Sequence, residues 1–302
     1  MHYSENAEAS LLPYVKLVTP EKNTDFDNVI EEYVCQRGDV NIYMLLSTRH
    51  RHMRILDYRI GNYQLKRNML DEFCRRKKVR KVFTLVEKQD SNSWRTVGFS
   101  REAAVPAFFR TADAYVMSRA YDEDGSPLTG GLSKISSEYT IKPPRTVRRP
   151  PGLKVEVVED NRKIMDKVYR DGSTEFYSPF GKGLKGPELA VRAKVGRKDK
   201  WVVAEINDSF GHAKLDFLHT AGDAKELGML VHGAESLVNA LCELEVANIF
   251  GFSYVDEEMT AEAFGAAGFR NTGQLTRHVT PNGAEPVDVH VWHRRIGPKR
   301  QD

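Results

Sequence analysis

The first half of the chain combines strand-like runs with one clear helical pattern. Runs rich in apolar and β-branched residues predict strands at 40–48, 53–61, 81–88 and 112–121. The first two of these flank the polar turn RHRH, which predicts a hairpin. Apolar residues at helical spacing predict a helix over 63–76, and the stretch REAAVPAFFR predicts a short helix interrupted near Pro106. Together these elements predict an incomplete α/β layer.

The second half gives a longer series of elements. Helices are expected near 160–169 and over 223–245 and 257–267, and strands at 154–158, 187–195, 200–208, 212–219, 247–255, 269–279 and 286–295. Turn residues at 196–199 join two of these strands into a hairpin, and the run at 212–219 continues it as a third antiparallel strand. The long helix carries its apolar residues on one face. The series predicts an α/β fold of the α+β type, in which helices flank a mixed, mostly antiparallel sheet.

The length of 302 residues favours two domains. The stretch IKPPRTVRRPP at 141–151 holds four prolines and four basic residues without an acidic one, which is typical of an extended connector. We therefore expect an N-terminal tail at 1–24, a domain at 25–140, a linker at 141–152, a second domain at 153–296 and a C-terminal tail at 297–302.

Composition narrows the classes of protein that fit. Hydrophobic residues make up 40% and charged residues 29% of the chain, which is ordinary for a globular protein. No apolar run reaches about 18 residues and the first twenty lack a signal-peptide pattern, so we expect a cytoplasmic protein without a membrane segment. Cys35, Cys74 and Cys242 are far apart, so neither a disulfide nor a zinc site is expected. A net charge of +3 gives no support for nucleic-acid binding.

Four segments carry a resemblance to a known superfamily. They are AEIND together with LDF (204–217), FGAAGF (264–269), VDVHVW (287–292) and, in the first half, VPAFFRTADAYVMSRAY (105–121). With the element order, they resemble the GCN5-related N-acetyltransferase (GNAT) superfamily over about residues 39–296, and more narrowly the β-lysine acetyltransferase group. The resemblance implies tandem GNAT-like domains, with an incomplete first copy that covers the second domain or shapes its acceptor cleft. It also implies an acetyl-CoA- or acyl-CoA-dependent N-acyltransferase.

The resemblance further implies where a cofactor would bind. The third hairpin strand and the strand after the long helix would diverge, and the pantetheine arm would pair with the exposed edge. The pyrophosphate would lie at the start of the long helix. The cofactor residues implied are Leu215, Phe217, Leu218, His219, Asp223, Lys225, Leu227, Gly228 and Met229.

The sequence departs from the superfamily's phosphate-loop pattern. Only Gly228 matches it, while Asp223 and Glu226 add negative charge beside an anion site. Asp223 could instead cap its own helix, and the sequence leaves both roles open.

Carboxylates on apolar strands are the candidates for a catalytic base. Glu205 is the first choice and Asp216 the second, because a buried charge needs a partner or a purpose; strand alternation also allows both to face water. The superfamily's tyrosine acid would fall at Phe264, which has no proton to donate. Tyr254 is a substitute acid or an ordinary packing residue.

Three histidines are lesser candidates for the chemistry. His290 and His293 fall on opposite faces of the last strand, so no metal pair is expected there, and His219 is the third of this group.

The acceptor and the partners are less defined. Phe176, Tyr177 and Phe180 belong to a loop that would form one wall of a pocket for a small-molecule amine. The nearby GKGLKG lacks P-loop spacing. The sequence leaves open whether the protein binds a protein partner and whether it forms a homodimer. The alternatives are a catalytically inactive scaffold or acyl-CoA sensor and, with least support, a nucleic-acid adaptor that uses Arg145, Arg148 and Arg149.

Overall fold

The computed structural model describes residues 15–18, 30–48, 50–56, 62–109, 112–128, 146–158, 164, 188–207, 211–280 and 285–297. The chain divides into two compact units. The first comprises Met1–Ala103, Ala114–Ser136 and Thr276–Pro286, and the second comprises Ala104–Asp113, Ser137–Leu275 and Val287–Asp302. Each unit therefore includes a short segment from the other half of the sequence.

The strands of the first half follow one another in the order β1-β2-β3-β4-β5-β7-β6. Their bounds are Val15–Val18 (β1), Ile30–Arg37 (β2), Val40–Ser47 (β3), His52–Ile55 (β4), Lys81–Val86 (β5), Ser100–Val105 (β6) and Ala114–Ala120 (β7). β4 and β5 are parallel, whereas β1–β2, β2–β3, β3–β4 and β5–β7 are antiparallel.

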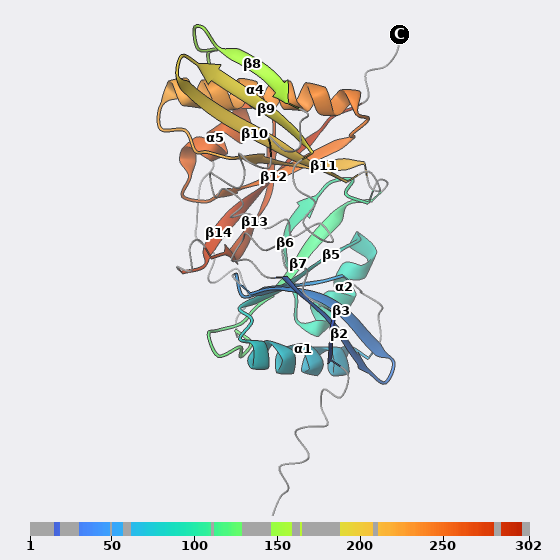
Figure 1. Cartoon of the computed structure of the whole chain (residues 1–302). Coiled ribbons are helices and arrows are strands. Elements are labelled where there is room, and N and C mark those ends of the chain that lie inside the picture. Colours follow the sequence, from blue (N-terminus) through green and yellow to red (C-terminus); the bar gives the residue numbers. More distant parts are fainter. Residues whose placement is uncertain are drawn as a thin grey trace, which may run out of the picture. The chain divides into compact units, whose positions relative to one another are not determined.

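Helix α1 (Tyr63–Lys77) forms where apolar residues at helical spacing predicted it, and its two ends are stabilised by polar residues. The Asn62 side chain caps its start by accepting from the Leu65 amide at 2.9 Å, and three basic residues occupy its last turn, where cations are favourable. Figure 1 shows α1 beneath β2 and β3, and the buried residues of α1 belong to the core cluster of this half. The 3-10 turn η1 (Lys88–Asp90) leads into α2 (Ser91–Val97).

The strands of the second half repeat the same order, β8-β9-β10-β11-β12-β14-β13. Their bounds are Lys154–Val158 (β8), Leu189–Val195 (β9), Lys198–Asn207 (β10), His212–Phe217 (β11), Asn248–Tyr254 (β12), Arg270–Val279 (β13) and Val287–Arg295 (β14). β11 and β12 are the parallel pair, and β8–β9, β9–β10, β10–β11 and β12–β14 are antiparallel.

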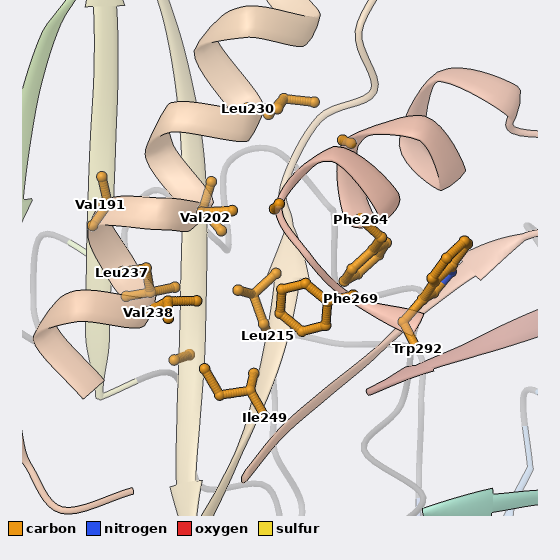
Figure 2. Close-up of a cluster of buried hydrophobic side chains, with 14 of the residues drawn as sticks. Val191, Val202, Leu215, Leu230, Leu237, Val238, Ile249, Phe264, Phe269 and Trp292 are labelled. Atoms are coloured by element: carbon orange, nitrogen blue, oxygen red, sulfur yellow. The ribbon is translucent and has the colours of Figure 1, made fainter. Parts of the chain in front are cut away.

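The long helix α4 (Ala224–Glu243) packs its apolar face on one side of this second sheet. It contacts β9 and β10 and shares its core with α5 (Glu258–Ala266). Figure 2 shows side chains of α4 over Val191 and Val202, and the aromatic rings of Phe264, Phe269 and Trp292 beside Leu215. No described helix is long and apolar enough to cross a membrane.

The two halves also repeat local details. A glycine with positive φ ends the second helix of each half: Gly98 (φ +100°) and Gly268 (φ +79°). In each half an arginine of the last strand lies over this glycine: Arg119 donates to the Val97 carbonyl at 3.3 Å, and Arg294 donates to the Ala267 carbonyl. The repetition therefore extends from strand order to side-chain contacts.

Most predicted elements agree with the structure, and the exceptions lie in the first half. The short helix predicted within 101–110 is wrong, because 100–105 forms β6, whose alternate residues Ala103 and Val105 are buried. Pro106 ends this strand and interrupts no helix. Strands β1 and β2 and helix α2 were not predicted, so the first half carries more elements than its sequence indicated. The helix predicted near 160–169 lies outside the described residues except for Ile164.

Candidate functional site

The parallel strands β11 and β12 separate before either strand ends. Their ladder runs from His212 opposite Asn248 to Leu215 opposite Gly251. β11 nevertheless continues to Phe217 and β12 to Tyr254, where each keeps only its outer partner, β10 or β14. We call the point beyond Leu215 and Gly251 the split. It is the divergence that the sequence resemblance implied.

The edge of β11 at the split carries the backbone groups that a ligand could pair with. The Leu218 amide donates to the Trp201 carbonyl of β10 at 3.1 Å. Because successive residues of a strand direct their backbone groups to opposite neighbours, Leu215 and Phe217 direct theirs away from β10. Within the described residues no ladder partner of Phe217 lies on that side.

Aromatic rings fill the helix side of the split. The Phe264 ring is fully buried, lies 4.8 Å from the Phe217 ring and stacks on Trp292 at 5.5 Å. A Cβ at Gly251 would stand 2.7 Å from this ring and 2.7 Å from the Leu215 carbonyl oxygen. Only glycine permits this approach, and the Phe264 side chain itself has no proton to donate.

The carboxylate candidates lie on the opposite face of the sheet. Val202 and Ala204 belong to the core under α4, so Glu205 points to the other face, and the same alternation places Asp216 there. Glu205 is directly opposite Lys214 in the β10–β11 ladder. Glu205 and Asp216 are thus diagonal neighbours, with Cα atoms roughly 7–8 Å apart, and the structure brings the two candidates together.

Lys214 is the residue of this face that the sequence analysis missed. Its Nζ lies 2.8 Å from Asp216 Oδ2, and the two side chains are 6% and 20% exposed. Asp216 Oδ1 is buried and has no hydrogen-bond partner among the residues that the structure describes. An apolar strand that holds a lysine two residues before an aspartate was the available signal, because same-face neighbours of a strand are two residues apart.

The remaining acid and histidine candidates are divided between the two faces of the sheet. Tyr254 is 9% exposed, pairs with Val289 and shares the face of Asp216. His293 contacts Asn248 Oδ1 at 3.2 Å, and burial lowers the pKa of both His290 and His293. His219 is half-buried. In the part of the chain that the structure describes, no group of three or more potential ligands could hold a metal ion.

The start of α4 is occupied by its own carboxylates. Asp223 Oδ1 accepts from the Glu226 amide at 2.7 Å, and Glu226 Oε2 accepts from the Gly222 amide at 3.0 Å. Lys198 and Lys200 reach Glu226 at 2.7 and 2.9 Å, and these contacts lower its pKa to about 2. Asp223 therefore caps its helix, which was one of the two roles left open.

Gly228 contacts the polypeptide where a phosphate was expected. A Cβ there would stand 2.8 Å from two ring carbons of Pro150 and 2.9 Å from the Arg148 carbonyl oxygen. Pro150 is buried and Val147 packs on the α4 core. The close approach that requires glycine is thus made by residues 147–150.

The other expected cofactor residues divide between core and surface. Leu227, Met229 and Leu218 are buried in apolar clusters, and Lys225 is exposed beside Asp223. The expected acceptor wall of Phe176, Tyr177 and Phe180 lies outside the described residues.

Comparisons with known proteins find similarity of fold and not of sequence. No family model and no curated protein matches the chain. Among solved structures, the ribosomal-protein-S18-alanine N-acetyltransferase from Escherichia coli is similar at 12% identity and a TM-score of 0.37, over 50% of this chain and 97% of that chain.

Two further solved structures are similar to a comparable extent. The spermidine N-acetyltransferase from Vibrio cholerae, in complex with CoA and spermine, is 15% identical with a TM-score of 0.36, over 48% of this chain and 95% of that chain. A GNAT-family acetyltransferase from Streptococcus pneumoniae is 13% identical with a TM-score of 0.37, over 48% and 99%. The similarity to the GNAT fold is distant and spans about half of this chain.

Proposed function

We propose that the second unit is an acetyl-CoA- or acyl-CoA-dependent N-acyltransferase that acts on the amine of a small metabolite or amino acid. The observation that carries this proposal is the split, where β11 ends its ladder at Leu215 and leaves the backbone groups of Phe217 toward β12. An amide-containing arm such as pantetheine can add to such an edge as an extra strand.

The chemistry requires positioning and one proton transfer. The amine nitrogen attacks the thioester carbonyl carbon, the C–S bond breaks, and an amide and a CoA thiolate form. Glu205 is the proposed base, which takes the proton that the amine loses and returns it through solvent to the thiolate. The thiolate needs no tyrosine acid, which is consistent with phenylalanine at position 264.

We also propose that the first unit is a second copy of this fold. The support is the shared strand order and the matched contacts of Gly98 with Arg119 and of Gly268 with Arg294. In this proposal the first copy carries no acyl-CoA, and the second unit holds the cofactor.

A second candidate function is a non-catalytic acyl-CoA sensor or scaffold. The start of α4 favours it, because Asp223 and Glu226 occupy amides that would hold a phosphate and residues 147–150 cover Gly228. Two carboxylates at a helix start weaken an anion site by roughly 1 kcal/mol each.

Two measurements separate these functions. Calorimetry with acetyl-CoA tests binding, and release of free thiol across a panel of amines tests transfer. The enzyme proposal predicts binding and thiol release that Glu205→Gln lowers by roughly 100-fold or more, while Glu156→Gln on the exposed outer strand β8 leaves release unchanged. Binding without release for any amine would favour the sensor, and absence of binding would contradict both.

A further inference from the structure

We propose that Phe264 restricts the acyl group that the second unit holds to acetyl, because its ring fills the helix side of the split. This inference rests on the proposed function and names the class of donor: a CoA thioester with the shortest acyl chain. Phe264 is a specificity-determining residue in this proposal and takes no part in proton transfer.

The first support is the shape of the split, which is closed at one end. The closed end is the pair of Leu215 and Gly251, the last partners of the β11–β12 ladder. The nucleotide of an acyl-CoA carries charged phosphates, which are costly to bury and therefore stay at the open end. The acyl group is the opposite terminus of the molecule, so it lies at the closed end beside Gly251.

The second support is the difference between the two faces of the sheet. An acyl chain at the closed end can extend toward either face. One face carries Glu205, the proposed base, and the amine must reach the thioester carbonyl from that face. A chain that extended there would take the place of the amine. Any carbon beyond acetyl must therefore extend toward α4 and α5.

The third support is the position of the Phe264 ring on this helix side. A Cβ at Gly251 would stand 2.7 Å from Cε1 and 2.7 Å from Cζ of the ring, so the ring edge lies against the backbone at the closed end. The Phe264 side chain is fully buried. Because packed interiors admit extra methylenes only at a cost, a chain longer than acetyl collides with this ring.

The neighbours of Phe264 hold its ring in place. The rings of Phe217, Phe269 and Trp292 pack on it at centre distances of 4.8, 5.2 and 5.5 Å, and Figure 2 shows Phe264 and Trp292 side by side. Rotation of the ring would have to displace one of these neighbours. Removal of the ring leaves an apolar cavity instead, and such cavities stay dry and take up apolar ligands. A smaller residue at position 264 should therefore admit a longer acyl chain.

The test is calorimetric titration of the full-length protein with acetyl-CoA and with hexanoyl-CoA. Wild type is expected to bind acetyl-CoA at least about 10-fold more tightly than hexanoyl-CoA. Phe264→Ala is expected to bind hexanoyl-CoA roughly 10- to 100-fold more tightly than wild type does, because the added methylenes enter the cavity. Phe264→Leu, which keeps more of the core, is expected to shift the ratio of the two affinities in the same direction by roughly 3- to 10-fold.

The matched control is Leu237→Ala, which opens a cavity elsewhere in the same core. Figure 2 shows Leu237 beside Val191 of β9 and apart from Phe264, and β9 lies two strands from β11. This variant is expected to keep the wild-type ratio of the two affinities. Thermal unfolding shows whether each variant is folded, and Phe264→Leu decides the matter where Phe264→Ala does not fold.

The outcomes keep this inference apart from the proposed function. Equal affinities of wild type for the two thioesters overturn the inference even if acetyl transfer occurs. A folded Phe264→Leu variant that keeps the wild-type ratio, or weakens both thioesters in parallel, overturns it as well, because the ring then has only a structural role. The expected shift without thiol release for any amine supports the inference and contradicts transfer. Absence of binding of both thioesters overturns the proposed function and this inference together.

Discussion

Lowering the pH from about 7.5 to about 5.5 is expected to loosen the first unit, because two of its buried histidines must stay neutral in the fold. His52 of β4 and His278 of β13 are 2% and 3% exposed, and their ring centres are 5.1 Å apart. Burial lowers the pKa of both well below the ordinary value, and Lys81 and His50 lower it further. Lys81 is itself paired with Glu102 at 2.7 Å.

The expected size follows from linkage. A histidine titrates near 6.5 in the unfolded chain, so its neutral folded form contributes full stability above that pH and loses it as the pH falls. At pH 5.5 each such histidine costs about 1.4 kcal/mol, provided its folded pKa lies lower still. The two together cost about 3 kcal/mol, which corresponds to roughly a 100-fold greater population of the opened state.

Amide hydrogen exchange measures this opening locally. Protection factors of the β5 amides, corrected for intrinsic exchange, are expected to fall roughly 100-fold between the two pH values. His278→Phe is expected to reduce the fall to roughly 10-fold, because only His52 then titrates. His232→Gln, at a half-buried position of α4 beside Glu235 in the second unit, is the control and should behave as wild type.

The reasoning fails in two cases. Protection of β5 that is equal at both pH values would mean that these histidines are not held neutral. A pH dependence in His278→Phe as steep as that of wild type would place its origin elsewhere in the unit.

Four substitutions test the packing and the charges around the site. Gly228→Ala is expected to lower the free energy of unfolding in urea by about 1 kcal/mol, because overlap with Pro150 outweighs the gain in helix propensity. Gly222→Ala has room for the added methyl group and should change that free energy by less than about 0.5 kcal/mol. Phe264→Ala should cost about 3–5 kcal/mol, and a loss below about 1 kcal/mol would contradict its place in the core. Glu226→Gln should destabilise the protein above about pH 4.5. The difference in free energy of unfolding between this variant and wild type should vanish as the pH falls through about 2, where wild-type Glu226 is also protonated. A difference that persists there would refute the ionic contribution of Glu226.

Local patterns determined much of the fold. The 3.6-residue spacing predicted α1 and α4 to within two residues. Strand alternation places Glu205 on the face opposite the core residues Val202 and Ala204. These features need only sequence neighbours, because the period of a helix or strand is set by its own backbone. The stretch before Pro106 failed for the same reason, since its alanines suit either state and only the neighbouring strands select β6.

Contacts between distant residues were decided by the tertiary structure alone. The glycine at 228 fits a phosphate loop in the sequence, and only the position of Pro150 shows that protein backbone takes that place. The end of the β11–β12 ladder at Gly251 and the membership of Thr276–Pro286 in the first unit likewise have no local signal. Each depends on which side chains meet after the chain has closed loops of tens to hundreds of residues, and that outcome is a property of the whole packed core.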